Sequence, residues 1–146
     1  MTTLNSELLI DSKILRENIS YIKSKLENQT NFMSVIKSDA YGHNLEFIIK
    51  DIDDISDGYG VVRIEEAIKI RKFSDKKILL MQGVYTDADY QLARENNLDL
   101  VVHNNDQFSL IRKHNNFNNL WLKVNTGTVS YTHLRAHETR EDRVCR

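Results

Sequence analysis

The sequence predicts an α/β fold, the N-terminal portion of a (β/α)8 TIM-type barrel with about five parallel strands and intervening helices. Short apolar runs alternate with helical patterns at a spacing of roughly 20 residues, which is typical of βαβ units. The runs are continuously apolar, as expected of parallel strands buried on both faces. An open doubly wound sheet is the alternative. No Gly-x-Gly-x-x-Gly follows any run, so a dinucleotide-binding fold has no support.

The first expected element is a short strand over residues 7–10, followed by a helix. Asp11 or Ser12 can cap this helix, because each offers a side-chain oxygen to the free amides of the first turn. Apolar residues then recur at helical spacing and form one stripe along the helix: Ile14, Leu15, Ile19, Ile22 and Leu26.

The next expected strand, residues 32–36, is followed directly by a lysine. Lys37 is followed by a short polar turn that contains Gly42, and a helical pattern begins at Leu45. In α/β folds, active sites lie at the carboxyl ends of the strands. A lysine held beside a packed sheet can lose part of its hydration and become an amine nucleophile. The alternative is a solvated lysine without a chemical role.

The pattern of strands and helices continues beyond the lysine turn. The expected strands are 58–62, 77–81, 98–102 and 120–124, and the expected helices between them are 64–73, 87–96 and about 105–114. Asp87 is the expected cap of the second of these helices, and Asn105 or Asp106 that of the third. Gly83 permits the turn after the strand at 77–81.

Composition limits the functional class. The 146 residues suffice for one domain, and a formal net charge of −1 gives no reason to expect nucleic acid or an anionic membrane as a partner. Cys145 is the single cysteine, so no disulfide framework is possible within the chain. The N-terminus lacks a signal-peptide pattern, and no apolar run approaches the roughly 20 residues of a membrane span. We therefore expect a cytoplasmic protein.

Residues 128–146 differ in composition from the rest. They contain four Arg but no Lys and no Asn, whereas the preceding residues are rich in Lys and Asn and poor in Arg. No periodic pattern runs through them. We expect an unstructured tail that is foreign to the parent gene; the alternative is an ordinary solvated C-terminal segment. On the first interpretation, His133, His137 and Cys145 form no metal site, although their donor atoms are suitable.

Residues 35–43, which read Val-Ile-Lys-Ser-Asp-Ala-Tyr-Gly-His, resemble the pyridoxal-phosphate lysine motif of bacterial alanine racemases. Four later segments resemble the next barrel strands of that family in order: residues 60–67, 79–84, 101–107 and 121–127. The ordered resemblance covers residues 7–127. Related pyridoxal-phosphate barrels, such as basic amino-acid decarboxylases, share a lysine strand but not the Ala-Tyr-Gly-His turn.

The resemblance implies roles for residues of the turn. Lys37 would bind pyridoxal 5'-phosphate covalently and, once freed by the substrate, serve as the base on one face of the α-carbon. Tyr41 would contact the phosphate region of the cofactor, the alternative being a residue that only packs the turn. His43 would either support the turn or cap the next helix. Asn44 stands where the family usually has Gly, a mild departure.

Lys123 matches a lysine that is often carbamylated in this family, where the added carboxylate orients an arginine near the cofactor ring. The alternative is a charged strand end without this role. Asn125 stands where the family mostly has Asp, and Ser130 stands where the family has the arginine. The resemblance therefore breaks at Thr128, where the composition also changes.

The resemblance implies a homodimeric enzyme that interconverts L-alanine and D-alanine and supplies D-alanine for peptidoglycan. The family's second catalytic base, a tyrosine from a C-terminal β domain of the partner subunit, has no counterpart here, and neither do the later barrel strands. We therefore expect residues 1–127 to be a partial barrel domain, inactive or nearly so alone, with open edges at 32–36 and 120–124. Two other hypotheses stay open: a non-catalytic pyridoxal-phosphate-binding barrel, and a structural half-domain without cofactor.

Overall fold

The computed structural model describes residues 8–115 and 119–124, in which five strands alternate with six helices. The helices are α1 (Ser12–Lys23), α2 (Lys37–Gly42), α3 (Leu45–Ile52), α4 (Ile64–Arg71), α5 (Asp87–Glu95) and α6 (Asn105–His114). The strands are β1 (Met33–Val35), β2 (Gly58–Val61), β3 (Lys77–Leu80), β4 (Asp99–Val102) and β5 (Leu120–Leu122). No helix in this part of the chain is long and apolar enough to cross a membrane.

All five strands belong to one parallel sheet, and their order in space is their order along the chain. A doubly wound sheet reverses its strand order at a switch point, whereas a barrel wall does not. The predicted portion of a barrel wall is therefore confirmed. Within the described residues β1 pairs only with β2, and β5 only with β4, so the wall is not closed and both predicted edges are open.

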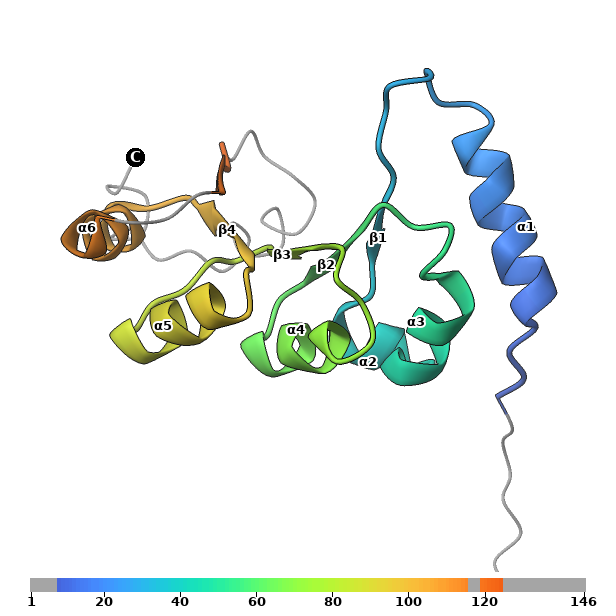
Figure 1. Cartoon of the computed structure of the whole chain (residues 1–146), viewed down its shortest axis with the longest axis horizontal. Coiled ribbons are helices and arrows are strands. Elements are labelled where there is room, and N and C mark those ends of the chain that lie inside the picture. Colours follow the sequence, from blue (N-terminus) through green and yellow to red (C-terminus); the bar gives the residue numbers. More distant parts are fainter. Residues whose placement is uncertain (1–7, 116–118, 125–146) are drawn as a thin grey trace, which may run out of the picture.

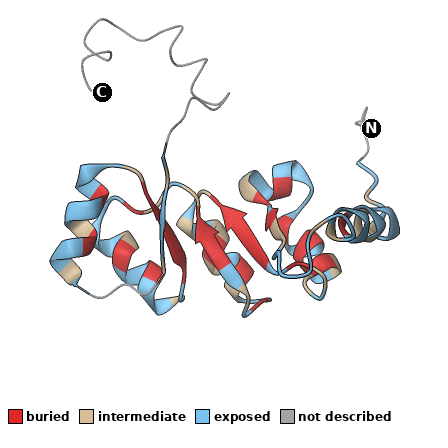
Figure 2. Cartoon of the chain, turned by 90° about the horizontal axis from the view of Figure 1, so that it is seen from above, coloured by how far each residue is buried: buried red, intermediate tan, exposed pale blue. Residues whose placement is uncertain are grey.

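The core lies between the sheet and the helices. Figure 1 shows α3, α4 and α5 along one side of the row of strands, with α1 and α6 beyond its two ends. Tyr59 of β2 is fully buried, and its hydroxyl donates to Asp53 Oδ1 at 2.9 Å, just after α3. Burial and this hydrogen bond raise the pKa of Tyr59. In Figure 2 the central strands are mostly buried, while the outward turns of the helices are exposed.

Helix α1 begins at the predicted cap and is linked to the segment after α3 by polar contacts. The Asp11 carboxylate accepts hydrogen bonds from the backbone amides of the first turn, at 2.9 and 3.1 Å. Arg16 donates two hydrogen bonds of 2.6 Å to the Asp54 carboxylate, and this pairing lowers the pKa of Asp54 to about 2. Of the predicted apolar stripe, only Ile19 is buried, and Ile14 and Ile22 are exposed.

The predicted caps of the two later helices are each wrong by at least one residue. Thr86, not Asp87, caps α5, and Asn104, not Asn105 or Asp106, caps α6. The side-chain oxygens of Thr86 and Asn104 accept amide hydrogen bonds at 3.1 and 2.9 Å. Both residues have extended backbone, which is the conformation a cap requires, and so the residues after them become the first helical residues.

Two further expectations about strands are wrong. Residues 8–10 form no strand, and residue 7 lies outside the described part of the chain. Leu9 is 84% exposed, with no sheet edge beside it to supply hydrogen bonds, and an isolated strand is not stable. The sequence also predicts that β5 is buried on both faces, but all three of its residues are exposed, Leu122 to 81%. Within the described residues β5 has a neighbouring strand on one side only.

We expect β5 to separate from the sheet before the other strands unfold, because it pairs on one side only and is exposed along its length. Trp121 is the single tryptophan and lies in β5. In a urea titration its fluorescence should change at a lower concentration than the far-UV circular dichroism. As a control, a Trp121→Phe, Phe73→Trp chain moves the reporter next to α4, where the two signals should coincide. Coincident transitions for Trp121 itself would contradict the prediction.

Candidate functional site

The residues that follow the five strands meet at one edge of the sheet, because parallel strands all end on the same side. Each strand is followed at this edge by at least one polar residue or glycine. These residues are Lys37 after β1, Arg63 after β2, Gln82 and Gly83 after β3, His103 after β4 and Lys123 after β5. Two of them, Lys37 and Lys123, are predicted site residues, and the topology brings both to this edge.

The turn that begins at Lys37 has an unusual backbone. Four successive residues, Ser38 to Tyr41, have φ between 54° and 56° and ψ between 36° and 51°, the left-handed region. Gly42 follows with φ 84°. A left-handed conformation costs roughly 1–2 kcal/mol per non-glycine residue, so four in a row persist only where surrounding contacts hold them. The short helix α2 is therefore a strained left-handed turn, a feature that the sequence pattern does not predict.

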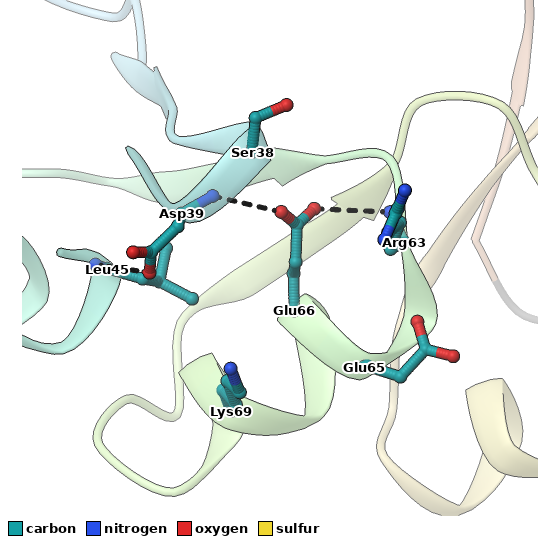
Figure 3. Close-up of a pocket in the computed structure, with 7 residues that line it drawn as sticks. All are labelled: Ser38, Asp39, Leu45, Arg63, Glu65, Glu66 and Lys69. Atoms are coloured by element: carbon teal, nitrogen blue, oxygen red, sulfur yellow. Dashed lines mark hydrogen bonds between the residues drawn. The ribbon is translucent and has the colours of Figure 1, made fainter. Parts of the chain in front are cut away.

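Contacts from two helices hold this turn (Figure 3). Glu66 Oε1 accepts a hydrogen bond from the backbone N–H of Asp39 at 3.2 Å, and Glu66 Oε2 accepts one from the backbone N–H of Arg63 at 3.3 Å. The Asp39 carboxylate in turn accepts from the N–H of Leu45, the first residue of α3, at 3.0 Å. Asp39 is thereby connected to the starts of both α3 and α4.

His43 and Asn44 close the turn and start the next helix. His43 Nδ1 lies 2.8 Å from the carbonyl oxygen of Ala40, and the His43 backbone N–H donates to the same oxygen at 3.2 Å. Asn44 is the cap of α3, since its side chain accepts from the N–H of Phe47 at 3.2 Å. His43 therefore supports the turn, and the alternative of a helix cap is wrong for it. Asn44 has φ 67°, which Asn tolerates better than most residues, and this explains how it stands in a position where Gly is usual.

Lys37 and Tyr41 lie at the two ends of the left-handed run. Lys37 is half-buried, and its Nζ lies 5.9 Å from the centroid of the Tyr41 ring. Tyr41 is 58% exposed, so it does not simply fill space in the core. A primary amine in this setting is partly withdrawn from water and still reachable, which suits covalent bonding to an aldehyde. A phenol hydroxyl nearby can donate to an anionic group.

A cavity of about 700 Å3 lies between the turn and α4. Its lining is polar and mixed in charge: Ser38, Asp39, Leu45, Arg63, Glu65, Glu66 and Lys69 (Figure 3). Lys37 is not among the lining residues. The cavity therefore belongs to the contact between the turn and the helix, and the amine of Lys37 is not directed into it.

At the other end of the sheet edge, Gln107 connects the residues after β3 with those after β4. Its Nε2 donates to the carbonyl oxygen of Gln82 at 2.6 Å, and its Oε1 accepts from the backbone N–H of His103 at 3.1 Å. Gln107 is almost fully buried, so these hydrogen bonds satisfy a polar group that has no access to water. Gly83 lies directly beside this bridge, since a Cβ at this position would be 2.8 Å from Gln107 Nε2.

His103 faces Tyr85 and Lys123 at this edge. Its Nε2 lies 3.5 Å from the Tyr85 hydroxyl, and its Nδ1 is buried without a hydrogen-bond partner in the described residues. Burial, with the charge of Lys123 as a second cause, lowers the pKa of His103, which keeps the imidazole neutral near pH 7. The backbone N–H of Lys123 donates to the carbonyl oxygen of Val102 at 2.9 Å, which continues the pairing of β5 with β4 past Leu122.

Sequence reasoning did not single out Glu66, Gln107 or His103 as residues that organise the site. A signal existed for Glu66, because an acidic residue at the third position of a helix is typical of a capping arrangement. No local signal exists for Gln107, whose partners lie in another strand's loop. Asn125, Ser130, His133, His137, Cys145 and the break at Thr128 lie outside the described residues.

Residues 10–129 match the protein family described as "Alanine racemase, N-terminal domain". The alanine racemase of Mannheimia succiniciproducens is 38% identical over 121 residues, which cover 81% of this chain and 34% of that protein. The alanine racemase of Haemophilus influenzae is 35% identical over 121 residues, covering 81% and 33%. The chain thus spans about a third of the length of the relatives it matches.

Solved structures show the same likeness. The alanine racemase of Acinetobacter baumannii superposes with a TM-score of 0.74 at 27% identity, covering 82% of this chain and 37% of that one. The biosynthetic alanine racemase of Pseudomonas aeruginosa gives a TM-score of 0.71 at 25% identity, covering 84% and 38%. The similarity therefore extends over more than four fifths of this chain.

We expect Gly83→Ala to destabilise the chain more than Gly42→Ala. Both residues have positive φ, 70° and 84°, so each substitution should cost roughly 1–2 kcal/mol in backbone strain. A Cβ at Gly83 would also lie 2.1 Å from the carbonyl oxygen of Val101, whereas a Cβ at Gly42 meets nothing within 4 Å. Overpacking adds about 1–3 kcal/mol at Gly83. Urea unfolding of the two variants would measure the difference, and equal free energies of unfolding would contradict the prediction.

Proposed function

This chain belongs to the alanine racemase family through its N-terminal domain, and on that premise we propose that it is part of an enzyme that interconverts L-alanine and D-alanine. The whole enzyme is an isomerase that uses pyridoxal phosphate, acts in the cytoplasm as a homodimer and supplies D-alanine for peptidoglycan. The observation that carries the proposal is the position of Lys37, which follows β1 at the carboxyl edge of the sheet and begins a strained turn.

The residues of the turn fit pyridoxal phosphate. Lys37 offers a half-buried amine that would hold the aldehyde carbon covalently, and the centroid of the Tyr41 ring lies 5.9 Å from that amine. The Tyr41 hydroxyl would donate to the phosphate. Pyridoxal phosphate, when bound, delocalises the electron pair that is left at the α-carbon after its proton is removed. The protein's contribution is to place a base beside that carbon and to hold the reacting groups in one orientation.

Lys37 would do the proton transfer on one face of the substrate. In one direction of the reaction its amine would remove the proton from the α-carbon on that face, and in the other direction it would deliver a proton there. Racemisation also needs a proton donor on the opposite face, and we assign that role to a tyrosine outside this chain, in the partner subunit. The reaction therefore needs a proton-transferring residue on each face of the α-carbon.

Lys123 would support the cofactor indirectly. We infer that its amine carries a carbamate, whose negative charge would orient a cationic side chain near the cofactor ring. Two observations support this: Lys123 lies at the same sheet edge as Lys37, and it is half-buried beside His103, a neutral imidazole.

We propose that residues 1–127 are a partial barrel domain and that residues 128–146 are a tail foreign to the family. The family match ends at residue 129, close to the change in composition at Thr128, which supports this division. The match also favours the racemase over a non-catalytic pyridoxal-phosphate carrier, since the matched relatives are named alanine racemases.

Lys37→Ala should abolish specific attachment of pyridoxal phosphate to the chain, because Lys37 supplies the amine. The chain would be incubated with pyridoxal phosphate, reduced with borohydride and analysed by peptide mass spectrometry. We expect modification concentrated at Lys37 in the unaltered chain and in a Lys72→Ala control, which removes an exposed lysine after α4. Modification spread evenly over the lysines, or unchanged by Lys37→Ala, would overturn the proposed cofactor role.

The chain of 146 residues should racemise alanine at a rate close to the background, because it spans only about a third of the length of the alanine racemases that it matches. D-Alanine formed from L-alanine can be measured by coupling to D-amino-acid oxidase, with a full-length relative as the positive control. Turnover by this chain that is lost in Lys37→Ala would show that the missing residues are dispensable.

A further inference from the structure

We propose that Glu66 is a positioning residue for Lys37, because its carboxylate fastens the left-handed turn that begins at Lys37 to the first turn of α4. The role of Lys37 in this proposal rests on the proposed function. The fastening of the turn by Glu66 is a separate claim that can be tested by itself.

The first step is that Glu66 uses both of its carboxylate oxygens, one on each element. Oε1 accepts from the N–H of Asp39, inside the left-handed run, and Oε2 accepts from the N–H of Arg63, the residue that precedes α4. Figure 3 shows the carboxylate between these two backbone amides. A single side chain therefore joins the loop after β1 to the loop after β2, on neighbouring strands of the sheet.

The second step is that the turn needs such a contact. Ser38 to Tyr41 all have positive φ, and none of them is a glycine. Residues of this kind relax to ordinary conformations unless their surroundings prevent it. Asp39 lies inside the run, and both its N–H and its carboxylate are held from outside, by Glu66 and by Leu45. If Asp39 is released, the direction in which the chain leaves Lys37 is no longer fixed.

The third step is that the neighbouring Glu65 does not fasten the turn to α4. Glu65 lies in the same first turn of α4 and carries the same charge toward the helix dipole. Its side chain points away from Asp39 in Figure 3, and in the described part of the chain it has no hydrogen bond or ion pair. Glu65 is therefore a matched control that separates the loss of a charge at the helix start from the loss of the fastening.

The main comparison is Glu66→Gln against Glu65→Gln, with Glu66→Ala as a stronger variant. Gln keeps the shape of Glu but has one accepting oxygen, so one of the two backbone amides loses its acceptor. Loss of a hydrogen bond to a charged group corresponds to a change on the order of tenfold in the local opening equilibrium. We expect amide hydrogen exchange in residues 38–42 to rise by about tenfold in Glu66→Gln and further in Glu66→Ala. Exchange in Glu65→Gln should match the unaltered chain.

The second measurement is the rate at which pyridoxal phosphate becomes attached to Lys37, trapped by borohydride at increasing times. We expect a slower rate in Glu66→Gln than in Glu65→Gln, while attachment at the exposed Lys72 is the same in both. If Glu66→Ala does not fold, the two Gln variants decide the question. Equal exchange and equal trapping in both Gln variants would overturn the proposal. If exchange rises but Lys37 is not modified even in the unaltered chain, the proposed function fails and the fastening by Glu66 stands.

Discussion

A run of left-handed residues is stable only between elements that do not move, and this constraint connects most of the contacts around the candidate site. The run from Ser38 to Tyr41 begins two residues after Ile36, whose backbone N–H donates to the carbonyl oxygen of Gly60 at 3.0 Å. Its middle is held by Glu66 at the start of α4, and its exit by Asn44 at the start of α3. The sheet, α3 and α4 thus form the frame that holds the turn beginning at Lys37.

The sequence was sufficient for the parts of the fold that depend on periodicity. Apolar runs located all five strands of the sheet, and the pattern alone placed Lys37 at a strand end. It was not sufficient where tertiary contacts decide. The left-handed run has only Gly42 as a local sign, and the partner of Asp39 lies 27 residues away in the chain. The cap of α5 was missed for a different reason: Thr86 and Asp87 both carry a suitable oxygen, and backbone conformation decides between them.

The sheet edge also shows why a buried polar residue can be as important as an apolar one. Gln107 is in the core, yet its contribution is to connect the loops after β3 and β4 by two hydrogen bonds. Gly83 makes this connection possible, since any side chain there would collide with the backbone of β4. The loops after β3 and β4 are therefore fixed relative to each other. His103 is held at the edge by the hydrogen bond from its backbone N–H to Gln107.

The strand order has a consequence for how the chain reaches its folded state. Each strand pairs with the one that follows it along the chain, so the contacts that form the sheet join segments close in sequence. Each of these pairings closes a shorter loop than a pairing between more distant strands would, so it costs less chain entropy. During synthesis, each strand from β2 onward leaves the ribosome after the strand with which it pairs first. The loops after β1 and β2, with Glu66 between them, are therefore complete before the later strands have been translated.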